Sequence, residues 1–302
     1  MTGVDRPLPL RPMGLGDLLD GAVKLFMANW RALLLTVAVV VVPVQLVVAW
    51  LARDITSTGL FQLFTDPTAF DLAEVEQLGG ADVGAFLITL WVSVLVLPVL
   101  TGAVCAIAGG SYVGRPVAWK AALQVAGRRG GSLVGATILI GIVQFLVVVP
   151  ALLIGIAVLA TGSGGLLLLA VLLLLLGAVG VLAISGLYTA TVPAIVTEDL
   201  GPAQGMGRSW RLRRPRLWPT VVAVLVAGLL SGIVGLMISG LLSFAGSFAA
   251  GGFAWVLVGA GEILAQLIQI PFLAIVSTLL YFDGRIRNEG FDLQIAAGEL
   301  GE

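Results

Sequence analysis

Long apolar runs dominate the sequence, and the short segments between them hold most of the charged residues. Six runs are long enough to cross the hydrocarbon core of a bilayer as a helix, which takes about 20 residues. They cover residues 32–51, 84–108, 133–160, 166–188, 217–244 and 253–281. Every position of residues 166–176 is apolar, whereas the strands of a membrane barrel alternate in polarity. The pattern predicts an all-α, polytopic membrane protein with six transmembrane helices.

The connections between the runs complete the predicted organisation. Residues 161–165 read Thr-Gly-Ser-Gly-Gly, a strong turn signal, so the third and fourth runs form a hairpin rather than one helix. Residues 53–83 form an acidic outer loop, in which Asp66-Pro67 and Gly79-Gly80 predict the start and end of a short helix. We expect one membrane domain over residues 1–302, in which residues 1–31 and 282–302 are polar terminal segments.

A short basic segment precedes each outgoing run, at residues 15–31, 116–129 and 202–216. In the first segment one helical face is apolar, and Asp17, Asp20 and Lys24 lie opposite. That apolar face comprises Leu15, Leu18, Leu19, Ala22, Phe26 and Trp30. The middle segment is less regular, because Trp119, Leu123 and Val125 do not form a clean stripe. We expect three amphipathic helices on the membrane surface, and therefore three pseudo-repeated units that each contain a surface helix and a transmembrane hairpin.

The distribution of charge predicts the orientation. Charged residues make up only 11% of the chain and apolar residues 59%, whereas soluble domains are about a quarter charged. If the N-terminus lies inside, Arg53 is the only one of the 16 Lys and Arg residues in an outer segment. Such a bias follows the positive-inside rule. We therefore expect a multi-pass protein of the bacterial plasma (inner) membrane with both termini in the cytoplasm.

Several kinds of chemistry have no residues to support them. The chain contains no histidine, and Cys105 is its single cysteine, so zinc sites, imidazole catalysis and intramolecular disulfides are not expected. The sequence also lacks a nucleotide-binding loop, a nucleophile elbow and a paired-carboxylate signature. We expect neither enzyme activity nor a cofactor, and nothing predicts binding to nucleic acid.

A few polar residues interrupt the apolar runs and are candidates for function. Glu262, Gln266 and Gln269 share one face of the last run. Glu262 either marks an ion or proton path or lies in water at the outer interface, about 30 Å from the inner boundary. Gln45, Gln144 and Gln269 lie at similar depths, about 17 to 21 Å from the inner ends of their helices, and could meet in one polar layer. Such amides either hydrogen-bond helices together or line a permeation path.

Small residues and prolines within the runs bear on how the helices pack. Gly228 and Gly232 have a spacing that permits close helix contact, as do Gly102, Ala106 and Gly110. Prolines occur at positions 43, 98, 150 and 271, one in each of four runs. Proline-kinked helices can line cavities, because the carbonyl groups freed by the kink become available to ligands.

Five arginines precede the fifth run and are candidate ligands for lipid headgroups. They are Arg208, Arg211, Arg213, Arg214 and Arg216. Beside a membrane they would attract anionic lipids, at about 1 kcal/mol for each charge near the surface. They could instead serve only to fix the topology, or they could pair with the C-terminal acids Asp283, Glu289 and Asp292.

Three patches give the chain a family resemblance. They are residues 11–20 (RPMGLGDLLD), residues 192–198 (VPAIVTE) running on to Arg208-Ser209-Trp210, and residues 281–293 (YFDGRIRNEGFDL). In these patches the chain resembles the bacterial membrane-protein family named after the membrane domain of glycerophosphoryl diester phosphodiesterases. The resemblance implies a six-helix membrane module with shared cytoplasmic motifs. It does not imply the phosphodiesterase activity, which in that family belongs to a separate soluble domain that uses histidines and metal-binding carboxylates.

Two functions of different kinds remain open, with a third behind them. The leading hypothesis is a non-enzymatic membrane module that binds lipid or a partner protein at the inner leaflet, because the recognisable motifs gather on the cytoplasmic segments. The alternative is a transporter or channel for a small solute or ion. An enzyme acting on lipid comes third, because carboxylates can serve as general acids and bases. Expected partners are the bilayer with its anionic lipids, and a membrane protein or a second copy of the chain.

Overall fold

The computed structural model of the protein describes residues 11–52, 87, 90–160, 164–248 and 254–294. Every regular element in these ranges is a helix, and the longest helices are apolar enough to span a membrane at six places. In chain order the elements are α1 (Leu15–Ala52), the π-helix η1 (Val92–Val96), α5 (Leu97–Tyr112), α6 (Trp119–Arg128), α7 (Gly130–Ala160), α8 (Gly164–Tyr188), α9 (Thr191–Glu198), α10 (Pro202–Arg213), the 3₁₀ helix η2 (Arg214–Arg216), α11 (Leu217–Ser247) and α12 (Ala254–Glu289). The predicted all-α class and the six spans are confirmed.

The helices extend past the apolar runs on the basic side. The last run was expected to end at residue 281, but α12 continues to Glu289, and α5 continues from residue 108 to Tyr112. Polarity marks where the hydrocarbon core would end, whereas a helix continues as long as its backbone and side chains find partners. The predicted short helix in residues 53–83 lies outside the described residues.

A bend at Asn29 divides α1 into the two parts that the sequence predicts. Asn29 has non-helical backbone angles (φ −121°, ψ 15°). Its amide nitrogen donates to the carbonyl oxygen of Leu25 at 3.0 Å and to the hydroxyl of Ser111 on α5 at 2.9 Å. The side chain therefore supports the bend and fastens it to a neighbouring helix. By contrast, Pro43 lies inside the helical run of α1 after this bend.

The first short helix has three kinds of face. Leu18, Ala22 and Leu25 are buried against the rest of the protein. Asp17, Asp20 and Lys24 are exposed. Val23, Met27 and Trp30 are also exposed and make a second apolar stripe at helical spacing. One apolar face therefore packs on the bundle and another remains outside it, as expected of a helix at a membrane surface.

α6 has a regular buried face that the irregular pattern of Trp119, Leu123 and Val125 did not predict. Val125, which made the predicted stripe irregular, is exposed. The buried residues are Ala122 and Ala126, with Trp119 and Leu123 half-buried beside them. These four positions have the spacing of one helical face. The pattern was hidden because alanine adds little hydrophobic signal, although its small side chain lets α6 approach α5 closely.

The long helices contact one another in a cyclic order. Within each hairpin the outgoing helix contacts the returning one: α1 with α5, α7 with α8, and α11 with α12. Each returning helix also contacts the outgoing helix of the next hairpin, so that α5 contacts α7, α8 contacts α11, and α12 closes the ring on α1. The three pseudo-repeated units are thus neighbours around a ring.

The bends between short and long helices follow the same cyclic order. The bend of α1, at residues 28–32, shares a pocket with residues 116–118, which lead into α6. The bend before α7 carries Arg129, which forms an ion pair with Asp199 in the connection to α10. The bend before α11 shares a pocket with the residues that lead into α1. Each bend therefore packs against the start of the next surface helix around the ring.

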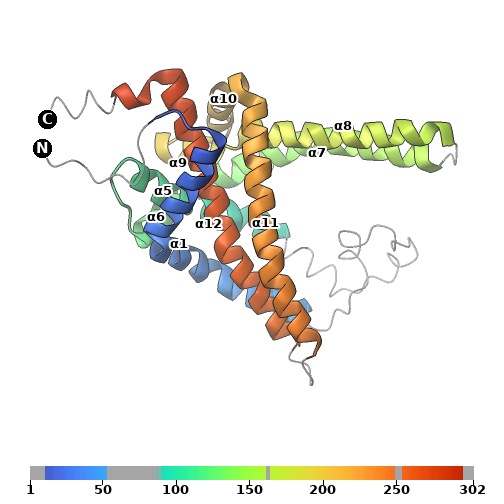
Figure 1. Ribbon diagram of the computed structural model, residues 1–302, viewed down its shortest axis with the longest axis horizontal. Helices are drawn as coiled ribbons and strands as arrows, with labels where there is room; N and C mark the ends of the chain where they lie inside the picture. The colour runs from blue at the N-terminus through green and yellow to red at the C-terminus, as the bar shows by residue number, and fades with distance from the viewer. Residues whose placement is uncertain (1–10, 53–86, 88–89, 161–163, 249–253, 295–302) are drawn as a thin grey trace, which may run out of the picture.

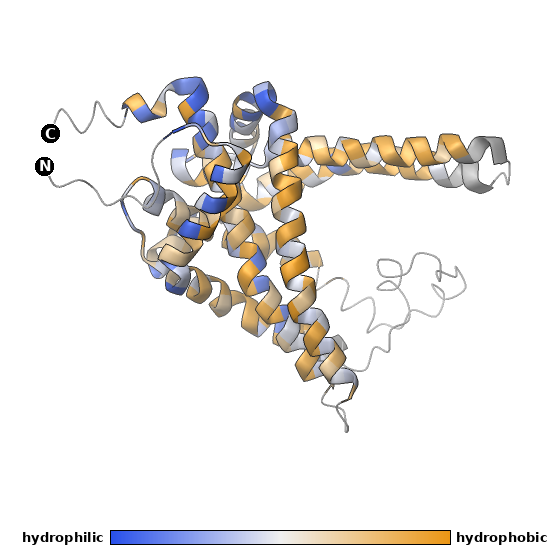
Figure 2. Cartoon of the chain, viewed as in Figure 1, coloured by the Kyte–Doolittle hydropathy of each residue, from blue (hydrophilic) through white to orange (hydrophobic). Residues whose placement is uncertain are grey.

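The molecule has a polar end and long apolar extensions. Figure 1 shows α9, α10 and the last turns of α12 together at one end, while α7 and α8 extend away as a paired arm. Figure 2 shows that hydrophilic residues gather at this end and that the arm and α11 are mostly hydrophobic. Large apolar side chains such as Phe145, Leu153 and Met237 are exposed along the extensions. A bilayer solvates such surfaces, and the chain is a polytopic membrane protein. We call the polar end the basic end.

Candidate functional site at the basic end

The three sequence patches that carry the family resemblance converge at the basic end. Residues 11–20 lead into α1, residues 192–198 form most of α9, and residues 281–293 include the last turns of α12. Hydrogen bonds join the first patch to the third and the second to the third. Segments far apart in the sequence therefore build one polar site.

Arg208 of α10 lies between two carboxylates and forms what we call the Arg208 clasp with Glu198 and Glu289. Its Nε and Nη2 donate to Glu198 at 2.8 to 2.9 Å, and its Nη1 and Nη2 donate to Glu289, with Nη2 at 2.8 Å. A guanidinium group can bind both because its five N–H donors form a planar fork. Since Glu198 ends α9 and Glu289 ends α12, the clasp joins three helices.

Tyr281 and Arg285 extend the clasp along α12. The Tyr281 hydroxyl donates to Glu198 Oε1 at 2.6 Å and accepts from Arg285 Nη1 at 3.3 Å. The Arg285 guanidinium lies 4.0 Å from the centre of the Phe291 ring, close enough for a cation–π contact. Arg285 Nε also lies 3.5 Å from Glu289 Oε2. Arg208 and Arg285 therefore balance the charges of Glu198 and Glu289, and the cluster has no net charge. We interpret this cluster as structural.

A second cluster on α12 is centred on Asp283 and holds the residues before α1 in place. Asp283 Oδ1 accepts from the backbone N–H of Met13 at 3.0 Å and from Arg287 Nε at 2.7 Å. Arg287 Nη2 in turn donates to the carbonyl oxygen of Met13 at 2.8 Å. Asp283 and Arg287 together therefore replace the backbone partners that Met13 lacks outside a helix.

Arg213 is the most deeply buried charged side chain at the basic end, with 2% of its surface exposed. Its Nη1 donates to the Thr220 hydroxyl at 3.2 Å, and its Nη2 lies 3.8 Å from Asp283 Oδ2. Gly284 makes room for it, because a Cβ atom there would lie 2.3 Å from Arg213 Nη2. Among the described residues its Nε has no hydrogen-bond acceptor. Arg213 is thus buried with fewer partners than its donors require.

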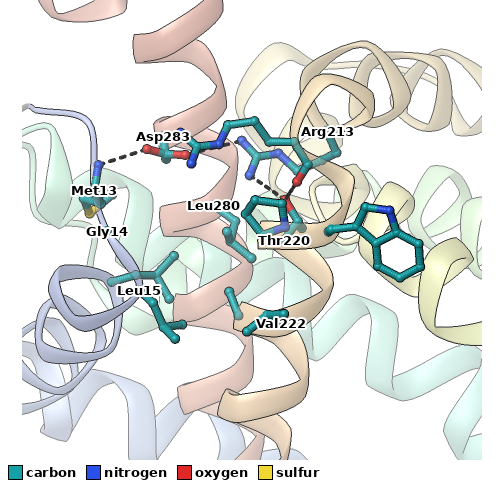
Figure 3. Close-up of a pocket in the computed structure, with 13 residues that line it drawn as sticks. Met13, Gly14, Leu15, Arg213, Thr220, Val222, Leu280 and Asp283 are labelled. Carbon is teal, nitrogen blue, oxygen red and sulfur yellow. Dashed lines mark hydrogen bonds and ion pairs between the residues drawn. The ribbon is translucent and has the colours of Figure 1, made fainter. Parts of the chain in front are cut away.

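Arg213 borders a cavity of about 420 Å³ between the starts of α1 and α11 and the end of α12. Such a volume lies within the roughly 300–1,000 Å³ typical of small-molecule sites. We call it the Arg213 pocket; its lining consists of Met13, Gly14, Leu15, Leu18, Arg213, Arg216, Trp218, Pro219, Thr220, Val222, Ala223, Leu280 and Asp283. Figure 3 shows Arg213 and Asp283 at one end and Leu15 and Val222 toward the other. The pocket therefore has a charged end and an apolar end.

The five candidate arginines fall into two groups. Arg208 and Arg213 are held by acids of α12, which is the pairing with Asp283 and Glu289 that the sequence left open. Arg211, Arg214 and Arg216 are exposed. Spacing alone could not separate the groups, because the side of the helix that faces α12 is set by tertiary packing.

The amides of Gln144 and Gln269, two of the three glutamines that could have met in one polar layer, bond to different hairpins. Gln144 Nε2 donates to the Ser185 hydroxyl at 3.1 Å, which joins α7 to α8. Gln269 Nε2 donates to the carbonyl oxygen of Ser231 at 3.2 Å, which joins α12 to α11. Equal depth did not imply proximity, because the α7–α8 arm diverges from the other hairpins (Figure 1). Gln144 and Gln269 therefore each join the two helices of their own hairpin.

The remaining polar candidates lie along the spans, away from the basic end. Glu262 is exposed on α12, near its start at Ala254. Gln266 on α12 and Gln45 on α1 are half-buried. Within the described ranges no group of three or more His, Cys, Asp or Glu side chains could hold a metal ion. Cys105 is buried in α5.

Sequence reasoning missed much of the Arg213 pocket. Arg213 is among the candidate arginines, but Trp218, Thr220 and Val222 lie inside the fifth apolar run, where nothing set them apart. A threonine one turn inside a span, directly after Trp-Pro, was the available signal. Comparisons with protein-family models, with curated proteins and with solved structures find no match for this chain, so the family resemblance stays a prediction.

Proposed function

We propose that the protein is a non-catalytic membrane module that binds anionic lipids at its basic end, which faces the cytoplasm of a bacterial plasma membrane. The observation that carries this proposal is the abrupt change of exposed surface along α10 to α11. Arg214 and Arg216 are exposed, and within two turns the exposed residues become Trp218 and Val222. Lipid phosphates lie at such a boundary between polar and apolar surface, beside the ring of an interfacial tryptophan.

The orientation follows from the same charges. The exposed arginines and the surface helices lie at one end, and the positive-inside rule assigns such an end to the cytoplasm. The anionic cytoplasmic leaflet would then attract each exposed guanidinium by about 1 kcal/mol. The family resemblance fits this proposal, because it implies shared cytoplasmic motifs without the phosphodiesterase domain.

The test measures the lipids around the protein in nanodiscs that contain equal amounts of phosphatidylglycerol and phosphatidylcholine. We expect the lipids released with the wild-type protein to be enriched in phosphatidylglycerol. The triple variant Arg211→Gln, Arg214→Gln, Arg216→Gln should lose most of this enrichment. The matched triple variant with lysine at the same positions should retain it, because the charge is unchanged. Equal lipid composition around all three proteins would refute the proposal.

Transport is not supported by an observation of comparable weight. Gln144 and Gln269 are bound within separate hairpins, and Glu262 is exposed. A flux assay in proteoliposomes addresses this alternative directly. If the wild-type protein supports solute or ion flux and Glu262→Gln abolishes it, transport would replace lipid binding as the proposed main function.

A further inference from the structure

We propose that the Arg213 pocket binds one anionic glycerophospholipid, with its phosphate at Arg213 and Arg216 and an acyl chain along Val222 and Leu280. The inference rests on the proposed lipid binding and deepens it, because it assigns a single site of defined stoichiometry. The exposed arginines would attract many lipids weakly, whereas the pocket would hold one.

The first argument is the electrostatic state of Arg213. A buried charge is costly unless it is paired and fully hydrogen-bonded. Among the described residues Arg213 makes one hydrogen bond, to Thr220, and the nearest carboxylate oxygen, Asp283 Oδ2, is 3.8 Å away. The other oxygen of Asp283 is already occupied by Arg287 and by the Met13 N–H. Arg213 therefore needs a further anionic acceptor, and the pocket is where one could bind.

The second argument is the net charge around the pocket. Arg213 and Arg216 line it, and Arg287 is bound to its single lining carboxylate, Asp283. Three guanidinium groups against one carboxylate leave an excess of positive charge. The first turn of α1 does not add to this excess, because the N–H of the lining residue Gly14 already donates to Asp17 Oδ2 at 3.1 Å. The charged end is therefore suited to a phosphate group.

The third argument is the shape and position of the apolar end. Leu15, Trp218 and Val222 are lining residues that are also exposed, at 40%, 59% and 49%, so the pocket opens on the outside of the bundle. Figure 3 shows Val222 on α11 and Leu280 on α12, both farther from the basic end than Arg213. This direction leads from the basic end into the apolar spans. A phosphate group joined to a hydrocarbon chain would fill both ends.

These features favour a membrane lipid over a soluble phosphate compound. A soluble phosphate compound would place its polar groups against the apolar lining. A phospholipid, in contrast, reaches the opening from the bilayer and matches both ends of the pocket. The related pocket at the bend of α1 serves as an internal comparison, because it contains Trp30 and Arg31 but its arginine is exposed. We expect no tight lipid site there.

The experiment is a titration by native mass spectrometry. The delipidated full chain in detergent is titrated separately with phosphatidylglycerol, phosphatidylcholine, diacylglycerol and glycerol 3-phosphate. We expect one phosphatidylglycerol to bind at high ionic strength, more tightly than phosphatidylcholine. Diacylglycerol lacks the phosphate and glycerol 3-phosphate lacks the chains, so both should bind about tenfold more weakly or worse.

Two variants test the two ends of the pocket, and a third is the control. Arg213→Met removes the buried charge but leaves Asp283 bound to Arg287 and Met13. Val222→Trp obstructs the apolar end at an exposed position and leaves every charge in place. Each should weaken the single phosphatidylglycerol site by about tenfold. Arg31→Met, in the related pocket, should change the affinity by less than about twofold.

The outcomes are decisive in either direction. If Arg213→Met does not fold, Val222→Trp still tests the site. Unchanged affinity in Val222→Trp, or in folded Arg213→Met, would overturn the assignment, as would diacylglycerol or glycerol 3-phosphate binding as tightly as phosphatidylglycerol. Loss of the single site alone, with the nanodisc enrichment preserved, would remove this inference and leave the proposed function standing. If the wild-type protein shows no phosphatidylglycerol enrichment in nanodiscs but keeps the single site, the proposed role of the exposed arginines fails and the pocket assignment stands.

Discussion

At the scale of single residues, the tightest glycine position between α11 and α12 is one that the sequence pattern did not identify. Gly228 and Gly232 had the expected small-residue spacing, but a Cβ atom at either would have nothing within 4 Å. Gly235 has the least room, because a Cβ atom there would lie 1.7 Å from Gln269 Nε2. The spacing of Gly228 and Gly232 does not mark a helix contact within the chain, and only the packing shows which face of α11 meets α12.

Gly235→Ala should therefore destabilise the protein. The added methyl group would displace the Gln269 amide and break its hydrogen bond to Ser231, at a cost of about 1 to 2 kcal/mol in the free energy of unfolding. Thermal unfolding in detergent measures the effect. Gly232→Ala, one turn away, is the matched control and should cost nothing. In a Gln269→Ala background the effect of Gly235→Ala should disappear, and an unchanged cost there would contradict the explanation.

At the scale of elements, the sequence determined the spans better than their connections. The length of an apolar run limits a membrane helix to within a few residues, so α8 and α11 begin within two residues of their predicted starts, at Gly164 and Leu217. The convergence of α9, α10 and α12 could not be read in this way. Their polar residues lie at similar intervals, and only tertiary packing shows that Arg208 lies between Glu198 and Glu289 while Arg211 is exposed.

Removal of the Arg208 clasp should loosen α10 from α9 and α12. Arg208→Gln would leave two carboxylates facing each other, with Arg285 as their remaining cation nearby. Breaking a fully buried pair costs about 3–5 kcal/mol, and we expect about 2 kcal/mol here because these side chains are 16–28% exposed. Hydrogen exchange should rise first in α10 and the end of α12, and thermal unfolding gives the total cost.

Two further variants show whether geometry or charge is responsible. Arg208→Lys retains the charge but cannot reach both carboxylates with a planar fork, so it should lie between the wild-type protein and Arg208→Gln. Arg211→Gln, an exposed position on the same helix, should change stability by no more than about 0.5 kcal/mol. A loss from Arg211→Gln as large as that from Arg208→Gln would mean that the total charge, rather than the clasp, stabilises this end.

At the scale of the whole molecule, three weakly similar units form a ring that is closed at the basic end. Each bend lies against the start of the next surface helix, and the third bend closes the ring on the residues before α1. The sequence predicted three units but not their cyclic contacts. This closure brings the first and last patches together, and the Arg213 pocket lies at the closing junction.

The orientation of this ring is the remaining whole-molecule prediction. All Lys and Arg residues except Arg53 belong to segments expected on the side of the basic end, so the positive-inside rule places Arg211 in the cytoplasm and Ser247, at the far end of α11, outside. In a Cys105→Ala background, Ser247→Cys should react with a membrane-impermeant maleimide in intact cells. Arg211→Cys should react only in inside-out vesicles. The reverse pattern would place the exposed arginines away from the anionic cytoplasmic leaflet, and the electrostatic basis of the proposed lipid binding would fail with it.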